Sequence, residues 1–153
     1  MLARPPISLQ ARALRLLSQR EHSRAELVRK LTPHAADDDE LARVLELVAA
    51  RQLQSDTRFA QSVVHRRQGQ FGRRRIAFEL SRHGLDATQT QTALAGLADS
   101  EKERALRVWR KRFDVPPASI EQKAKHYRFL AQRGFDGEII SWVLAAAKVL
   151  PSD

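Results

Sequence analysis

The chain has 153 residues, a formal net charge of +9 and a mean hydropathy of −0.47. It contains no cysteine, which excludes disulfides, thiol catalysis and cysteine-ligated zinc or iron–sulfur sites. No apolar stretch approaches the roughly 20 residues that span a bilayer, and the segment Met1–Pro6 lacks the apolar core of a signal peptide. We therefore expect a cytoplasmic protein with no membrane partner.

Apolar residues recur at helical spacing along the whole chain, and alternation typical of strands is not sustained. The clearest case is the series Leu41, Val44, Leu45 and Val48, which places four apolar side chains on one helix face. The pattern predicts nine helices, over residues 8–21, 23–32, 37–52, 56–69, 72–84, 86–98, 100–113, 119–134 and 136–149.

Capping residues mark several of these helix ends. The segments 23–26 (Ser-Arg-Ala-Glu) and 119–122 (Ser-Ile-Glu-Gln) fit a capping box. Gly84 and Gly134 are expected to close a helix in the left-handed conformation. The acidic run 37–40 is expected to cap a helix rather than to hold a metal ion, because no converging ligands are visible elsewhere.

The same pattern of residues returns about every 50 positions. A shift of 49 residues brings Leu27 onto Ile76, and a shift of 50 brings Leu80 onto Leu130 and Gly84 onto Gly134. We therefore predict an all-α fold of three tandem three-helix repeats, over residues 8–54, 55–99 and 100–150, that form an elongated, curved array. The alternative is one compact bundle that contains similar hairpins.

The net charge changes sign along the chain with about the same period. The net charge is +5 over residues 1–35, −4 over 36–57, +6 over 58–83, −2 over 84–100, +6 over 101–133 and −2 over 134–153. A basic stretch that returns in each repeat favours a long anionic partner.

The candidate binding residues are the basic side chains in equivalent parts of the three repeats, and their partner is expected to be DNA phosphate or an acidic protein surface. Free backbone N–H groups at the helix start after Gly72 could also meet a phosphate or a carboxylate. The alternative is a solvated basic surface with ion pairs such as Arg75–Glu79. The candidate set is Arg24, Arg66, Arg67, Arg73, Arg74, Arg75, Arg82, Arg104, Arg107, Lys111, Lys123, Lys125 and Arg128.

Most aromatic residues fall near apolar helix faces, so core packing is the expected role of Phe78, Phe129, Phe135 and Trp142. Phe71 and Tyr127 are the two rings that could stack on a base. The five histidines have no zinc-binding spacing, and no nucleophile-elbow, Walker or dinucleotide-binding motif occurs. We therefore expect no enzyme activity, no catalytic residue, no metal and no cofactor.

Three stretches of the chain resemble the RecX family of bacterial recombinase regulators, in the right order and over residues 9–149. The first is Leu16–Leu27 with Lys30-Leu31; the second is Phe59-Ala60, Arg66-Arg67 and Gly72–Ile76 with Glu79-Leu80; the third is Tyr127–Leu130 with Arg133–Phe135. The resemblance implies tandem three-helix repeats without catalytic activity or cofactor. It also implies a protein that modulates RecA, usually as an inhibitor, by lying in the groove of the RecA–DNA filament or by blocking its extension.

Three functions are compatible with these features. The leading hypothesis is a non-enzymatic regulator that binds the filament of RecA on single-stranded DNA and inhibits its extension, ATP hydrolysis and strand exchange. It would act as a monomer. Double-stranded DNA is a further candidate partner. The alternatives are a helix-turn-helix-like regulator that binds DNA directly and an RNA-associated factor.

Overall fold

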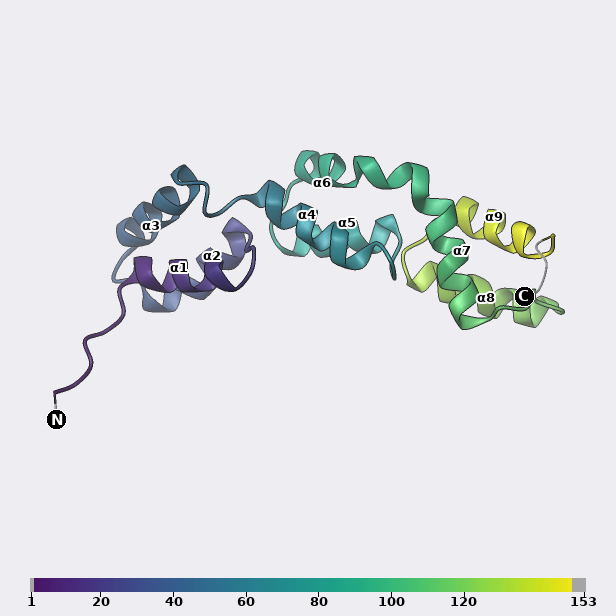
Figure 1. Ribbon diagram of the computed structural model, residues 1–153, viewed down its shortest axis with the longest axis horizontal. Coiled ribbons are helices and arrows are strands. Elements are labelled where there is room, and N and C mark those ends of the chain that lie inside the picture. Colours follow the sequence, from purple (N-terminus) through teal and green to yellow (C-terminus); the bar gives the residue numbers. More distant parts are fainter. Residues whose placement is uncertain (1, 150–153) are drawn as a thin grey trace.

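The computed structural model describes residues 2–149, and this part of the chain folds into nine α-helices and two 3₁₀ helices without a strand (Figure 1). The α-helices are α1 (Leu9–Gln19), α2 (Arg24–Leu31), α3 (Asp38–Ala50), α4 (Asp56–Arg67), α5 (Arg73–Arg82), α6 (Ala87–Leu94), α7 (Glu101–Arg112), α8 (Ile120–Gln132) and α9 (Gly137–Ala147). The 3₁₀ helices are η1 (Thr32–His34) and η2 (Ala95–Ser100). The predicted all-α fold is confirmed. One predicted helix is too long, because α6 ends at Leu94 and the chain tightens into η2.

The helices group into three modules that lie in a slightly bent row (Figure 1). Module 1 comprises α1–α3, module 2 comprises α4–α6 with η2, and module 3 comprises α7–α9. Each module has its own apolar cluster, centred on Leu27 in module 1, Ile76 in module 2 and Ile140 in module 3. The elongated array of three-helix repeats is thus confirmed, and a single compact bundle is not what the chain forms. We propose that the modules span residues 8–54, 55–99 and 100–150, so that the last residue of η2 is shared with module 3; residue 150 lies outside the described residues.

The serine caps explain where helices begin, and the glycine turns explain where they end. Gly84 and Gly134 have φ angles of +83° and +92°, a conformation that other residues rarely adopt. Ser23 accepts a hydrogen bond of 3.1 Å from the amide nitrogen of Glu26, as predicted. The predicted return bond from the Glu26 carboxylate is absent from the described contacts, because this carboxylate faces cations instead.

Modules 1 and 2 meet where the N-terminus of α2 touches the start of α4. The amide nitrogen of Arg24 donates to Oδ1 of Asp56 over 2.9 Å. Ala25 packs directly against the turn at Gly84, where an added Cβ would lie 2.5 Å from the Cβ of Ala25. A carboxylate and a close glycine turn from module 2 therefore hold the second helix of module 1.

Modules 2 and 3 are joined by the same kind of contact, in which a carboxylate of the later module binds a backbone N–H group at a helix start of the earlier one. The amide nitrogen of Arg73 donates to Oε1 of Glu101 over 2.9 Å. The amide nitrogens of Gly72 and Arg74 donate to the carbonyl oxygens of Arg133 and Gly134, over 2.7 and 3.1 Å. One N–H group at this helix start thus meets a carboxylate, as predicted, but it is that of Glu101 in the same chain, so the amides of Gly72, Arg73 and Arg74 are not free for an external phosphate. A repeat array needs such contacts between neighbours because each module has only a thin core.

The outer face of module 1 lacks one half of this arrangement. The first turn of α1 contains no acidic residue that could cap a helix of another copy. In both junctions inside the row, that carboxylate belongs to the first residue of α4 or of α7.

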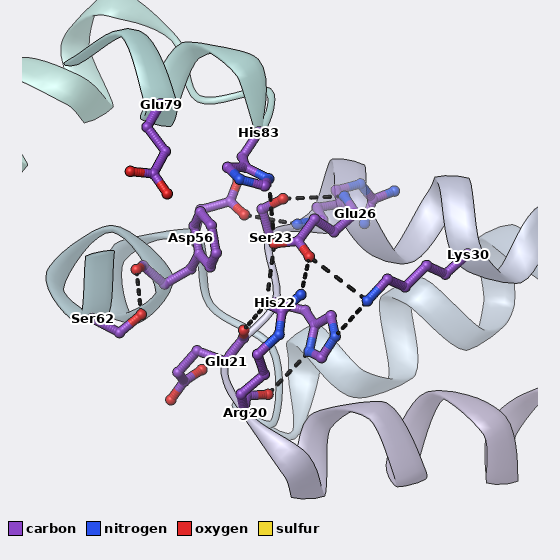
Figure 2. Close-up of polar contacts among 12 residues, drawn as sticks. Arg20, Glu21, His22, Ser23, Glu26, Lys30, Asp56, Ser62, Glu79 and His83 are labelled. Carbon is purple, nitrogen blue, oxygen red and sulfur yellow. Dashed lines mark hydrogen bonds and ion pairs between the residues drawn. The ribbon is translucent and has the colours of Figure 1, made fainter. Parts of the chain in front are cut away.

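A buried carboxylate adds to the junction between modules 1 and 2 (Figure 2). The side chain of Glu26 is 1% exposed, and its oxygens lie 2.6 Å from Arg20, 3.9 Å from Lys30 and 3.4 Å from His83. Burial alone would raise the pKa of Glu26. The hydrogen bond and charge of Arg20, together with His83 and His22, outweigh burial and lower this pKa. Because His83 belongs to module 2, this charge cluster joins two modules.

Candidate anion-binding surface

An open cleft of about 810 Å³ runs along α5. All three modules contribute to it, since α2 supplies Arg29 and the end of α8 supplies Gln132. We call it the central cleft. Its lining residues are Arg29, Arg67, Phe71, Arg74, Arg75, Phe78, Glu79, Arg82, His83, Ala131, Gln132 and Gly134.

The central cleft is strongly cationic, because five arginines line it and Glu79 is its only acidic residue. Glu79 accepts two hydrogen bonds from Arg67, at 3.1 and 3.2 Å, so it neutralises one arginine. The pair Arg75–Glu79, which the alternative of a solvated basic surface predicted, is absent from the contacts of residues 2–149. Within that range Arg29 and Arg82 have no carboxylate partner at ion-pair distance. An anion entering the cleft would therefore meet cations that are not already paired.

Three guanidinium groups lie close to the ring of Phe71. Arg75 stands 4.4 Å from the centre of its ring, Arg133 stands 5.6 Å away and Arg67 stands 5.9 Å away. These cation–π contacts hold the arginine side chains over a half-buried ring. Phe71 therefore organises the arginines, and its ring is largely covered by them.

The predicted core position of Phe78 is wrong. It was expected in the core, but 63% of its surface is exposed and it lines the central cleft. Phe135 is buried in the core of module 3, and Phe129 and Trp142 pack partly buried against that core. The error has a local cause: the apolar face of α5 is completed by Ile76 and Leu80, which leaves Phe78 on the opposite side of the helix.

Arg104 also differs from the expectation of an exposed basic stripe. Its guanidinium is 4% exposed and pairs with Glu101. It donates to the carbonyl oxygens of Gln68 and Phe71, over 2.8 and 3.0 Å, and to Ser100 over 3.0 Å. Burial lowers the pKa of Arg104, while Glu101 opposes that shift. Arg104 therefore joins module 2 to module 3 and is not available at the surface.

The remaining candidates are exposed but do not all converge. The central cleft contains four of them: Arg67, Arg74, Arg75 and Arg82. A second groove is lined by Arg107, Arg110 and Lys111, near the turn at Gly69. A third hollow beside α8 contains Lys123 and the half-exposed Tyr127. Exposed positions outside these three hollows are occupied by Arg24, Arg66, Arg73, Lys125 and Arg128.

The candidate set lacks Arg29, which lines the central cleft, and Arg133, whose guanidinium group lies over Phe71. The repeat register contained a signal for Arg29 and for the exposure of Phe78. A shift of 49 residues brings Arg29 onto Phe78, and a shift of 50 brings Phe78 onto Arg128. Phe78 thus occupies a position that is exposed and basic in both other modules.

The histidines are the remaining candidates for chemistry. His22, His83 and His126 lie in contact with residues that stabilise the fold, and His34 and His65 are exposed. His126 accepts a hydrogen bond of 3.0 Å at Nδ1 from the indole nitrogen of Trp109 and stacks on Phe113. Burial, with smaller contributions from nearby cations, lowers the pKa of His126. Among residues 2–149 no three histidine or acidic side chains gather in a way that could hold a metal ion. No helix in the same range is long and apolar enough to span a bilayer.

Comparison with known proteins gives a consistent result. Three domain models of one family match in order: the first three-helix domain of RecX over residues 11–46, the second over 55–94 and the third over 99–144. The regulatory protein RecX of Leptothrix cholodnii is 48% identical over 144 residues, which cover 94% of this chain and 92% of that protein. The regulatory protein RecX of Ralstonia nicotianae is 45% identical over 152 residues, which cover 99% of this chain and 96% of that protein.

Solved structures agree on the fold. The crystal structure of RecX from Lactobacillus salivarius superposes with a TM-score of 0.81 and covers 93% of this chain and 96% of that chain. The two sequences are 21% identical, so this likeness supports the architecture and not the details of the surface.

Proposed function

Because this chain belongs to the RecX family of regulatory proteins, we propose that it regulates the RecA recombinase. In this proposal it binds the filament of RecA on single-stranded DNA and inhibits filament extension, ATP hydrolysis and strand exchange. It acts without chemistry of its own and without a cofactor. It works in the cytoplasm as a monomer, which fits the first turn of α1, where the junction carboxylate of α4 and α7 has no counterpart.

The central cleft is the observation that carries the proposal. It collects arginines from modules 1 and 2 of an elongated array, with uncharged lining from module 3, and Arg29 and Arg82 have no acidic partner among residues 2–149. A surface of this kind fits a polymer that presents phosphates or carboxylates at regular intervals. Contacts spread over several RecA subunits would oppose the addition of further subunits.

The geometry of α5 argues against the helix-turn-helix alternative. Recognition helices place their N-terminal residues against base edges in the major groove. In α5 that end is covered by module 3, since Gly72 and Arg74 bond to the turn at Gly134. We therefore prefer a filament-binding protein to a sequence-specific regulator, and charge alone does not favour an RNA partner.

The test is the hydrolysis of ATP by RecA on single-stranded DNA. We expect the wild-type protein to inhibit it, and unchanged hydrolysis at equimolar or higher ratios would refute the proposal. The double variant Arg29→Glu with Arg82→Glu should inhibit much less. The matched control is Arg43→Glu with Arg51→Glu, which changes the net charge equally at exposed sites outside the cleft and should inhibit normally.

The salt dependence of filament binding provides a second readout. If the cleft contacts phosphates, the affinity should fall steeply between about 50 and about 200 mM salt. The cleft double variant should show a shallower dependence than the control, because fewer counterions are released. A complex that does not respond to salt would instead indicate contacts to protein alone.

A further inference from the structure

Phe78 is an exposed aromatic ring between cations. It projects from the middle of α5 and is 63% exposed, whereas the other five phenylalanines are buried or half-buried. Phe78 lines the central cleft and also the neighbouring shallow groove between α5 and α6, so the ring stands on the ridge between two hollows. Solvent therefore reaches the ring from both sides.

Arginines flank this ring along the helix. Arg74 lies four residues before Phe78 and Arg82 lies four residues after it, so all three share one face of α5. The guanidinium carbon of Arg82 is 5.9 Å from the centre of the Phe78 ring. The stripe from Arg74 to Arg82 covers about 12 Å of helix. Arg74 also lies 3.7 Å from the carboxylate of Asp136, in a surface pair whose two side chains are both largely exposed and which a phosphate can therefore displace at little cost. Cation, aromatic ring and cation thus alternate along the cleft.

The other ring of the cleft is not comparable. Phe71 is half-buried beneath Arg75 and two further guanidinium groups, so its face is occupied. Phe78 has only Arg82 nearby, at a longer distance. Within the central cleft, Phe78 is therefore the ring with a free face.

We propose that Phe78 is a stacking platform for one base of a single-stranded nucleic acid, whose phosphates on either side are bound by Arg74 and Arg82. The inference rests on the proposed function and deepens it, since it assigns the DNA contact to the middle module. Stacking suits this site because it needs only one open ring face and is available to every base. Duplex DNA offers no such base, because its bases are already stacked on each other.

An acidic protein segment is the competing occupant, and the shape of the site disfavours it. An apolar side chain that anchors a peptide binds best in an enclosed pocket that removes it from water. Phe78 stands on a ridge and is open on both sides. A planar base gains most of its contact from a flat ring, whereas a peptide side chain would stay half-solvated there.

The experiment measures DNA binding without RecA. Fluorescence anisotropy is recorded with a labelled strand of about 20 thymidines and with an abasic strand of the same length, which keeps the phosphates and lacks the bases. We expect the wild type to bind the thymidine strand at least about fivefold more tightly than the abasic strand. Phe78→Ala should abolish this difference, with no change in the affinity for the abasic strand or for a duplex.

Three further variants sharpen the result. Phe78→Trp should keep the preference for the thymidine strand, while Phe78→Leu, which is apolar but cannot stack, should lose it. Ile120→Ala is the control at another exposed apolar residue, 87% exposed and outside the central cleft, and should bind like the wild type. Circular dichroism should show equal helicity in all variants, because Phe78 contributes little to the core.

The outcomes separate the two proposals. An equal loss on thymidine and abasic strands would refute stacking. So would a wild type that binds neither strand yet inhibits RecA; the cleft would then face an acidic protein surface, and the proposed function would stand. Base-dependent binding without any effect on RecA would support the role of Phe78 and refute the proposed function.

Discussion

Gly72 and Gly134 are in backbone contact across the junction of modules 2 and 3. A Cβ built on Gly72 would lie 2.5 Å from the carbonyl oxygen of Gly134, and one built on Gly134 would lie 2.5 Å from the amide nitrogen of Arg75. Neither position can accept a side chain without separating the modules. The contact also brings the turn after α8 to the edge of the central cleft, so the shape of the cleft depends on it.

Gly134→Ala should therefore destabilise the protein by about 2–3 kcal/mol, since it combines a left-handed backbone with a clash against α5. Thermal unfolding followed by circular dichroism measures the loss. Gly96→Ala is the control, because an added Cβ there meets nothing within 4 Å. Equal stability of the two variants would show that the tight junction is not needed.

Glu26→Gln should weaken the junction of modules 1 and 2. The change removes the negative charge that Arg20, Lys30 and His83 share. Breaking a buried pair costs about 3–5 kcal/mol, but these cations are partly exposed and regain water, so we expect about 1–3 kcal/mol. Denaturant unfolding measures the loss. Glu79→Gln, which loses one half-exposed pair with Arg67, should cost less than about 1 kcal/mol.

Arg104 and Arg107 should separate structural from surface arginines. Arg104→Ala leaves the carboxylate of Glu101 without its buried partner and opens the carbonyls of Gln68 and Phe71, at a cost of about 3–5 kcal/mol. Arg107→Ala, at an exposed site on the same helix, should stay within about 0.5 kcal/mol of the wild type. Parallel unfolding curves check both, and similar losses would contradict the assignment.

Stability should fall as the pH drops from about 7 to about 5, because burial lowers the pKa of His22 and of His126 below the unfolded value of 6.5. The unfolded chain then binds protons that the folded chain does not, so stability is full above this value and is lost below it. At His126 the added proton would oppose the indole N–H of Trp109. A second loss should follow below pH 4.5, where Glu26 must be protonated.

Thermal unfolding at several pH values measures this dependence, and the fluorescence of Trp109 and Trp142, both in module 3, reports on that module. His126→Gln keeps a hydrogen-bond acceptor and removes the titrating ring. Its melting temperature should therefore vary less between about pH 7 and about pH 5. An unchanged slope in this variant would mean that His126 does not contribute to the pH dependence.

Much of the fold can be predicted from the sequence, because helices and their ends depend on local interactions. Helical periodicity, serine and aspartate caps and the glycine turns at Gly84 and Gly134 depend only on neighbouring residues, and they predict the helices and the repeat. The repeated basic stretches likewise follow from the order of residues. Four of the thirteen candidate residues, among them Arg74 and Arg82, line the central cleft.

Only the tertiary structure decided which of these side chains are free. Arg104 and Arg107 lie on neighbouring turns of one helix, yet module 2 buries the first and leaves the second exposed. Glu26 faces cations of two modules, and Arg29 reaches a cleft built mainly by α5. These outcomes depend on how one module packs against the next, which places residues about 30 or more positions apart in contact. Such packing is set by the shapes of whole surfaces, and a local sequence pattern does not contain that information.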